Sequence, residues 1–255
     1  MVPYAGQAIL HATIAALVIE ALLWLWRVDD PGERLRLRWV VLASPLVTAA
    51  FIAWVPARSA PSFAVEWAWF SGGRWDLLRI GPVGTATLVT FLLAGLGVVL
   101  YLRDAIPFLA DRASRREPDA LLPESDPAWG RVRRELAASA LAAGIPVPEA
   151  ALLATSTPVL LCTGIDRPRV VVSKGALDRL DNEELAAALA HELQHAASRD
   201  PLMGWWLMAA RTIQAFNPAI QIAGRQAVVD IERRADFAVV RGGLARPRAS
   251  ALAHS

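Results

Sequence analysis

Residues 180–201, LDNEELAAALAHELQHAASRDP, combine a helix start signal, an apolar run and two histidines in one short stretch. Asp181 is suited to cap a helix because its carboxylate can accept the backbone N–H of Glu184, whose side chain can bind back to the backbone of residue 181. The alanines and leucines that follow indicate that one face of the helix is buried. We therefore predict a helix that begins after Asp181 and ends near Ser198.

The two histidines of this helix have the spacing of a metal-binding pair. His191 and His195 are four residues apart, so both imidazoles project from one face and can share a metal ion. Glu192 completes the pattern H-E-x-x-H, in which the histidines bind zinc and the glutamate serves as a general base. The lone cysteine, Cys162, excludes an internal disulfide and a zinc knuckle built from cysteines. These residues predict a catalytic zinc site.

A catalytic zinc ion usually has three protein ligands, so a third must lie elsewhere in the chain. The segment VVDIERRADFAVV, residues 228–240, places Glu232 four residues before Asp236 on one face of a further predicted helix. This pair can supply one ligand and one acceptor for the second N–H of a zinc histidine. The alternative is that both carboxylates are solvated beside the two arginines between them. His11 lies in an apolar run and His254 in a terminal tail, which makes both poor candidates.

The composition is that of a membrane protein. Of the 255 residues, 55% are hydrophobic and 20% are charged, against about a quarter charged in an ordinary soluble domain. Three apolar runs approach or reach the length needed to cross a hydrocarbon core of about 30 Å: residues 5–26, 39–55 and 82–102. No basic residue precedes the first run, which argues against a secretory signal. We predict three transmembrane helices.

Arginine and tryptophan set the expected orientation. Arginines cluster after the first run and again after the third, and basic residues favour the cytoplasmic side. We therefore expect the amino terminus outside and everything after residue 102 in the cytoplasm. The tryptophans near the ends of the runs suggest two aromatic belts: Trp24, Trp26 and Trp39 on one face, and Trp54, Trp67, Trp69 and Trp75 on the other. No basic motif interleaved with aromatic residues indicates a nucleic acid as a partner.

Residues 201–224 are apolar enough to suggest a fourth span, but the predicted zinc site argues against it. A single crossing would place Glu232 and His195 on opposite sides of the membrane. We therefore predict a bent helix pair, broken near Asn217 and Pro218, that lies against or dips into the cytoplasmic leaflet.

Two charged residues in apolar surroundings are expected to avoid lipid, because a charge in hydrocarbon is costly. Arg211 lies inside residues 201–224, and Glu20 lies inside the first apolar run. We expect Glu20 to face protein, with Arg211 as its partner; the alternative is that it reaches water at the interface. Trp205 and Trp206 are expected at the membrane interface.

The rest of the chain predicts a small soluble domain. Residues 103–127 mix charges with four prolines and are expected to form a linker, and residues 242–255 are expected to form a flexible tail. The domain between them, 128–241, contains a predicted helix over 129–143 that the following glycine ends, and a hairpin of two short strands within 151–174. The predicted fold class is a mainly α membrane protein, with three transmembrane helices followed by a small α+β cytoplasmic domain.

Four motifs follow one another within residues 155–240: TP, GIDRPRVVVSKGALDRLDNEELAAALAHELQHAASRDP, FNP and DIERRAD. This order resembles the membrane-bound zinc peptidases of the BlaR/MecR antirepressor type, and more distantly the HtpX and CaaX-protease group. The short interval between the second histidine and the downstream glutamate favours the BlaR/MecR type. The resemblance implies a zincin-like domain of the gluzincin kind with one catalytic Zn²⁺. The implied roles are His191, His195 and Glu232 as ligands, Glu192 as the base, and Asp236 behind a histidine.

The resemblance also implies a function, that of a membrane-anchored zinc endopeptidase whose active site faces the cytoplasm. Its expected substrate is a cytoplasmic or juxtamembrane protein, such as a transcriptional repressor or the chain itself, bound in extended form along an edge strand such as Arg169–Ser173. The alternative is a catalytically silent membrane receptor or scaffold that retains the fold, which the intact Glu192 disfavours. The sequence stops soon after Arg248, so neither a final membrane helix nor an external sensor domain is expected. No oligomeric state is indicated.

Overall fold

The residues that the computed structural model describes are 2–54, 79–114, 120–164, 167 and 169–241. They form two compact units. The first contains the described residues up to 113 together with residues 206–230, and the second contains those from 114 to 205 and from 231 onward. The predicted tail, residues 242–255, lies outside the described residues.

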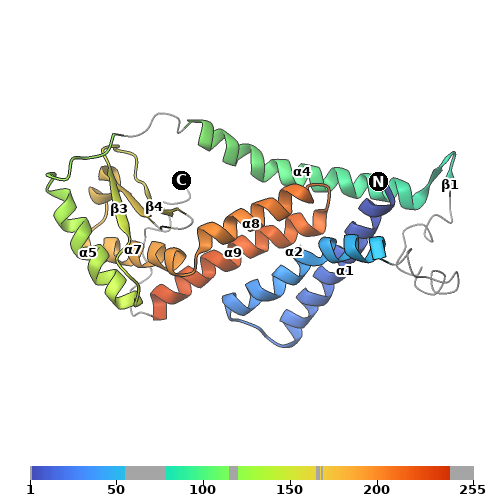
Figure 1. Ribbon diagram of the computed structural model, residues 1–255, viewed down its shortest axis with the longest axis horizontal. Coiled ribbons are helices and arrows are strands. Elements are labelled where there is room, and N and C mark those ends of the chain that lie inside the picture. The colour runs from blue at the N-terminus through green and yellow to red at the C-terminus, as the bar shows by residue number, and fades with distance from the viewer. Residues whose placement is uncertain (1, 55–78, 115–119, 165–166, 168, 242–255) are drawn as a thin grey trace. The chain divides into compact units, whose positions relative to one another are not determined.

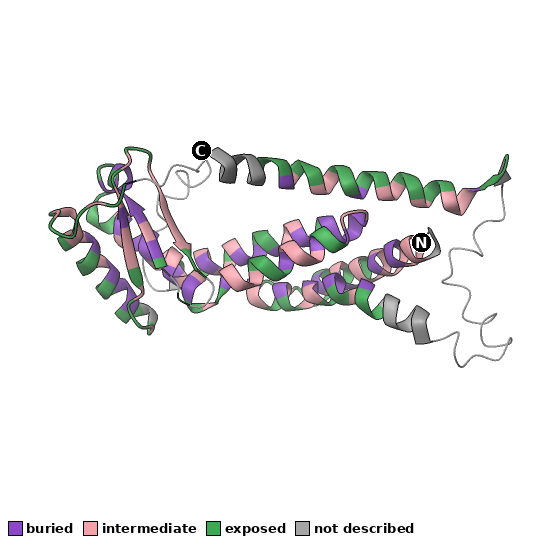
Figure 2. Cartoon of the chain, turned by 45° about the horizontal axis from the view of Figure 1, so that its top comes forward, coloured by how far each residue is buried: buried purple, intermediate pink, exposed green. Residues whose placement is uncertain are grey.

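The described residues of the first unit are helical apart from one short strand pair and connecting segments. Its elements outside residues 206–230 are α1 (Val2–Leu25), α2 (Pro31–Trp54), β1 (Arg79–Ile80), β2 (Val83–Gly84) and α4 (Thr85–Ser114). Within the described residues, two segments are long and apolar enough to cross a membrane, Tyr4–Leu25 and Thr85–Pro107. Their 22 and 23 residues correspond to about 33 and 35 Å of helix. Figure 2 shows exposed residues along most of α4, as expected of a helix that contacts lipid.

The second predicted span lies on α2, which starts earlier than the apolar run at residue 39. Pro31 suits the first position of a helix, and Asp30 caps this helix by accepting the backbone N–H of Glu33 at 3.0 Å. The arginine-rich segment after the first run is therefore largely helical. The side chains of residues 48–54 lie outside the described part of the chain, so this membrane span stays a prediction.

The tryptophans of the expected aromatic belts are described only in part. Trp24 and Trp26 at the end of α1 are strongly exposed, and so are Trp205 and Trp206. The side chains of the other expected belt lie outside the described residues: Trp54, Trp67, Trp69 and Trp75. The two belts therefore stay a prediction.

Helix α4 extends into the segment that we predicted to be a linker. It continues beyond residue 102 to Ser114, so residues 103–114 are helical. The charges of this segment suggested a solvated connection, but Asp104 is bound within the unit by Arg211 and Arg225. Arg225 donates to the two oxygens of this carboxylate at 2.8 and 2.9 Å. Asp104 therefore belongs to a helix that is bound within the unit, in place of the solvated linker that was expected.

The most deeply buried arginines of the first unit are paired with carboxylates. Arg38 of α2, 3% exposed, donates to Asp230 Oδ2 at 2.6 Å and also contacts Glu20 of α1. Arg211, 8% exposed, pairs with Asp104. Glu20 therefore has a protein partner as expected, but that partner is Arg38 and not Arg211. Both expected residues are paired because an isolated charge in apolar surroundings is costly.

Residues 201–224 form part of a helical hairpin made by α8 (Asp200–Ile213) and α9 (Pro218–Arg241), which run side by side in Figure 1. The predicted break near Asn217 is confirmed, because α9 begins at Pro218. The turn packs on two helices of the first unit: Asn217 Nδ2 donates to the Ala8 carbonyl of α1 at 3.1 Å, and a Cβ added to Gly97 of α4 would lie 2.4 Å from the backbone carbon of Phe216. This close approach requires glycine at position 97. Entry of the hairpin into the leaflet stays a prediction.

The second unit contains a three-stranded sheet in the order β3–β5–β4. The strands are β3 (Glu149–Leu153), β4 (Leu160–Thr163) and β5 (Arg169–Ser173). Strands β4 and β5 are antiparallel, which confirms the predicted hairpin, and β3 lies parallel to β5. The expectation that Arg169–Ser173 is an edge strand is wrong, because β3 and β4 occupy its two sides. The end of the predicted linker also joins the sheet, since Leu122 donates its N–H to the Leu152 carbonyl at 2.8 Å.

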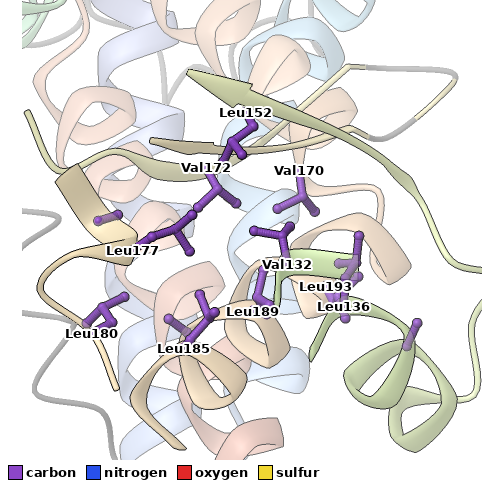
Figure 3. Close-up of a cluster of buried hydrophobic side chains, with 13 residues drawn as sticks. Val132, Leu136, Leu152, Val170, Val172, Leu177, Leu180, Leu185, Leu189 and Leu193 are labelled. Carbon is purple, nitrogen blue, oxygen red and sulfur yellow. The ribbon is translucent and has the colours of Figure 1, made fainter. Parts of the chain in front are cut away.

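Three helices accompany the sheet: α5 (Ala128–Ala143), α6 (Lys174–Leu177) and α7 (Asn182–Ala197). Figure 3 shows the core that they share with the strands, in which Leu152 and Val172 of the sheet gather with Leu189 and Leu193 of α7. The members of this core are Val132, Leu136, Ala140, Leu152, Val170, Val172, Ala176, Leu177, Leu180, Leu185, Ala188, Leu189 and Leu193. This packing fixes one face of α7 and leaves the other face for the candidate site.

The predicted helix ends of this unit are confirmed. Asp181 caps α7 by accepting the backbone N–H of Glu184 at 2.8 Å, and Glu184 accepts the backbone N–H of Asp181 at 3.1 Å. The C-cap of α7 is Ser198, where the helix was expected to end. Gly144 ends α5 with a φ of 67°, a left-handed conformation that glycine adopts without strain.

Candidate metal centre

Helix α7 presents two histidines on the face opposite its core side. Leu189 and Leu193 are fully buried in the core, and His191 follows Leu189 by two residues, which is about 200° around the helix axis. His195 lies one turn further along the same face. The Nε2 atoms of the two histidines are 3.2 Å apart, with the rings at 80° to one another. The spacing predicted from sequence therefore brings the two ring nitrogens together.

Glu232 of α9 completes a three-residue cluster with the histidines. Its Oε2 atom lies 3.5 Å from His191 Nε2 and 3.7 Å from His195 Nε2. Ligands at about 2.0–2.1 Å from a tetrahedral zinc ion are about 3.3 Å from one another. The separations of 3.2, 3.5 and 3.7 Å between the three atoms are close to this value. The donor set of two imidazoles and one carboxylate therefore fits a zinc ion in both chemistry and spacing.

The other ring nitrogen of each histidine faces a carboxylate. Asp236 Oδ1 is 3.3 Å from His191 Nδ1, so Asp236 lies behind a histidine as expected. Asp200 Oδ2 is 2.9 Å from His195 Nδ1. A carboxylate at Nδ1 favours the tautomer with the proton on that atom, which leaves Nε2 as the metal-binding atom. Both imidazoles are thus oriented with Nε2 toward Glu232.

Asp200 was not among the residues predicted for the site. It is 6% exposed and begins α8, five residues after His195. Arg199, which precedes it, has a φ of 55°, and this left-handed residue forms part of the turn between α7 and α8. Arg234 of α9 contacts the other oxygen of Asp200. The only signal in the sequence was an acidic residue directly after the H-E-x-x-H helix.

Glu192 lies beside the cluster and contacts strand β4. Its Oε2 atom accepts the backbone N–H of Cys162 at 2.6 Å. Burial raises the pKa of Glu192 above its usual value, although the neighbouring histidines and the Cys162 N–H act in the opposite direction. A carboxylate with a raised pKa can return a proton as well as accept one. The geometry therefore suits a general base.

The neighbouring groups also have shifted pKa values. Burial by itself lowers the pKa of His195, but the hydrogen bond to Asp200 and the charges of Glu232 and Glu192 outweigh it, so the pKa lies above the usual value. Burial, together with the charge of Glu192, raises the pKa of Cys162 to about 11. The thiol therefore keeps its proton at neutral pH.

The strand beside Glu192 is β4. Successive residues of this strand direct their backbone N–H and C=O groups alternately toward β5 and toward the opposite side. Ser173 of β5 donates its N–H to the Val159 carbonyl at 2.8 Å, so position 159 faces β5. By the alternation of an antiparallel pair, Leu160 and Cys162 direct their backbone groups away from β5. The bond from Cys162 to Glu192 agrees with this direction. The sheet edge at the candidate site thus belongs to β4.

The remaining sequence candidates take no part in this cluster within the described residues. His11 lies on α1 in the first unit, and His254 lies outside the described residues. The three residues that the structure groups as possible metal ligands are those predicted from sequence, His191, His195 and Glu232.

Comparison with known proteins identifies the family that this part of the chain resembles. Residues 150–248 match the family model of the BlaR1 peptidase M56. This segment includes the sheet, α7, α8 and α9, with every residue of the cluster described above. The resemblance to BlaR1- and HtpX-type membrane peptidases predicted from sequence is therefore confirmed.

Individual relatives are named HtpX or BlaR1. The chain is 44% identical over 63 residues to protease HtpX of Legionella pneumophila strain Philadelphia 1, which covers 24% of this chain and 22% of that protein. It is 30% identical over 125 residues to a protease HtpX homologue of Salinibacter ruber, which covers 48% of this chain and 43% of that protein. It is 28% identical over 78 residues to regulatory protein BlaR1 of Bacillus licheniformis, which covers 31% of this chain and 13% of that protein. Each match thus spans less than half of the relative's length, and together they point to a membrane protease.

Proposed function

We propose that the chain is a membrane-anchored, zinc-dependent endopeptidase. The observation that carries the proposal is the convergence of His191 Nε2, His195 Nε2 and Glu232 Oε2 within 3.2–3.7 Å of one another, beside the carboxylate of Glu192. The match of residues 150–248 to a peptidase family supports it. In this proposal the second unit is a zincin-like domain that follows three transmembrane helices.

The proposed reaction uses a metal ion and a general base. Zinc held by the two histidines and Glu232 would polarise a peptide carbonyl and lower the pKa of a water molecule. Glu192 takes a proton from the attacking water, whose oxygen bonds to the carbonyl carbon. The same side chain then delivers that proton to the amine nitrogen as the C–N bond breaks. The products are a carboxylic acid and an amine, so atoms and charges balance.

The substrate is proposed to bind in extended form along β4. The backbone groups of Leu160 and Cys162 point away from β5, and an extended peptide can pair with such an edge. The contact between Cys162 and Glu192 places this edge next to the base. Such main-chain pairing suits an endopeptidase that accepts internal segments of a protein.

The proposed location of the site is the cytoplasmic face of a cell membrane. Two described helices are long and apolar enough to span, and the likeness to protease HtpX and to regulatory protein BlaR1 supports a membrane protein. The arginines that follow the first and third apolar runs favour the cytoplasmic side for the second unit. The proposed substrate is therefore a cytoplasmic or juxtamembrane protein, such as a transcriptional repressor or the chain itself.

The test compares Glu192→Gln with Glu183→Gln in the full chain purified in detergent. Glu183 is an exposed glutamate on the same helix, so its variant controls for loss of a carboxylate. We expect both variants to retain one zinc per chain by mass spectrometry, and only Glu192→Gln to lose cleavage of an unfolded protein substrate and of the chain itself. Absence of zinc from the wild type would overturn the metal assignment. Zinc without any cleavage by the wild type would instead indicate a silent scaffold.

A further inference from the structure

Two residues next to the candidate metal centre, Arg234 and Asp200, form an ion pair. Arg234 lies on α9 between Glu232 and Asp236, and its guanidinium contacts Asp200 Oδ1. The other oxygen of the same carboxylate, Oδ2, is 2.9 Å from His195 Nδ1. The Asp200 side chain therefore bridges an arginine and a histidine, with one oxygen for each.

We propose that Arg234 is a positioning residue that acts on His195 through Asp200. By holding Oδ1, Arg234 fixes the plane of the carboxylate so that Oδ2 accepts the N–H at His195 Nδ1. His195 Nε2 is then left without a proton and directed toward Glu232. This inference rests on the proposed function, because it assumes that Nε2 binds the metal.

The burial of Asp200 explains why a partner is required. The Asp200 side chain is 5% exposed, and the Arg234 side chain is 23% exposed. A buried carboxylate without a cation is strongly destabilised. The turn that brings Asp200 back toward His195 is short, since only four residues separate the two. Backbone and counter-charge together hold the carboxylate in place.

One segment of α9 thereby serves both histidines. Glu232 contacts the Nε2 side of the pair, Asp236 orients His191, and Arg234 orients His195 by way of Asp200. These three residues lie within five positions of the chain. In the DIERRAD motif, Arg234 therefore has a role at the site in addition to the ligand Glu232 and the hydrogen-bond acceptor Asp236.

The test measures zinc affinity of the full chain in detergent by competition with a chromophoric chelator. The variants are Arg234→Met and its matched control Arg233→Met, which removes the same charge from an exposed neighbouring position. We expect Arg234→Met to weaken zinc binding on the order of 10-fold, within the range of about 10- to 100-fold seen for partners of zinc histidines. Arg233→Met should bind zinc within about twofold of the wild type.

A double-variant cycle tests the route through Asp200. Asp200→Ala should weaken zinc binding by about 10- to 100-fold. If Arg234 acts through this carboxylate, Arg234→Met should weaken binding less than about twofold further in the Asp200→Ala background. A purely structural role would lower affinity by the same factor in both backgrounds. Arg234→Lys, which keeps the charge but loses the planar fork, should recover part of the affinity and serves if Arg234→Met fails to fold.

The outcomes separate this inference from the proposed function. Equal zinc affinity of Arg234→Met and Arg233→Met would overturn the inference while leaving the proposed function intact. Multiplicative losses in the double variant would overturn the route through Asp200. A wild-type chain that binds no zinc would overturn both.

Discussion

Replacement of Gly97 by alanine should loosen the packing between α4 and the turn of the α8–α9 hairpin. A Cβ at this position would lie 2.4 Å from the backbone carbon of Phe216 and 2.8 Å from the backbone nitrogen of Asn217. These atoms belong to backbone, so they cannot move aside by a side-chain rotation. Gly95, two residues earlier on the same helix, has nothing within 4 Å of the place that a Cβ would occupy, which makes Gly95→Ala a matched control.

The size of the effect follows from the two substitutions together. Both replace a helical glycine by alanine, so the gain in helix propensity of about 1 kcal/mol is common to them and cancels in the difference. What remains is the steric term at Gly97, where α4 must move by about 1 Å to restore ordinary contact distances. Inserting one methyl group into a packed site costs about 1–3 kcal/mol. The contact between Tyr101 and Thr212, at 3.1 Å, would be stretched by the same movement.

The assay is thermal unfolding of the purified full chain in detergent. A difference of about 1–3 kcal/mol corresponds to roughly 2–12 °C in melting temperature for a chain of this size. We expect Gly97→Ala to melt below the wild type and Gly95→Ala at or above it. Equal melting temperatures for the two variants would refute the close approach of α4 to the turn.

Three further predictions concern the site, the membrane unit and the topology. Glu232→Ala should leave two histidines that cannot retain zinc through purification, whereas Asp236→Asn should still bind zinc, about 10- to 100-fold more weakly, as measured by metal content and competition; zinc lost by the second variant and kept by the first would reverse the roles. Arg38→Met should lower the free energy of unfolding by about 1.5–3 kcal/mol, because the buried Asp230 carboxylate loses its 2.6 Å partner and keeps only Arg34 at 3.4 Å, while Arg36→Met at an exposed position should change it by less than about 0.5 kcal/mol. A reporter fused after residue 69 should be external and one fused near the carboxyl end cytoplasmic; the same location for both would contradict the proposed orientation.

The parts of the site that depend on local sequence were predictable. The cap of α7 needs only Asp181 and Glu184, and the spacing of His191 and His195 follows from the helical repeat. The downstream pair of carboxylates was found by the same repeat. Asp200 was missed because its place depends on the turn before α8, in which Arg199 adopts a left-handed conformation that sequence does not indicate for an arginine.

The sheet was harder to predict, because its order depends on contacts between distant segments. The β4–β5 hairpin is local and was expected, but β3 pairs in parallel with β5 across some 20 residues. Its sequence, EAALL, has no β-branched residue, and its alanines and leucines are equally compatible with a helix. Because β3 was not predicted, β5 was expected to be an edge strand. The edge that faces Glu192 belongs instead to β4.

Charge pairing explains where the structure of the first unit differs from the sequence predictions. The segment after residue 102 was predicted to be a linker because of its charges, yet Asp104 has two arginine partners and α4 continues past it. Glu20 was matched with the wrong arginine for a similar reason. Sequence shows that a charge in an apolar run needs a partner, but the partner depends on which helices are neighbours.

The buried ion pairs of the first unit also fix the register of the hairpin along its neighbouring helices. Arg211 of α8 pairs with Asp104 of α4, and Asp230 of α9 pairs with Arg38 of α2. The hairpin is therefore held at two separate positions along its length. Sliding by one helical turn, about 5.4 Å, would separate both pairs at once. Each stranded charge in apolar surroundings costs several kcal/mol. The two ion pairs therefore oppose sliding of residues 206–230 along α2 and α4.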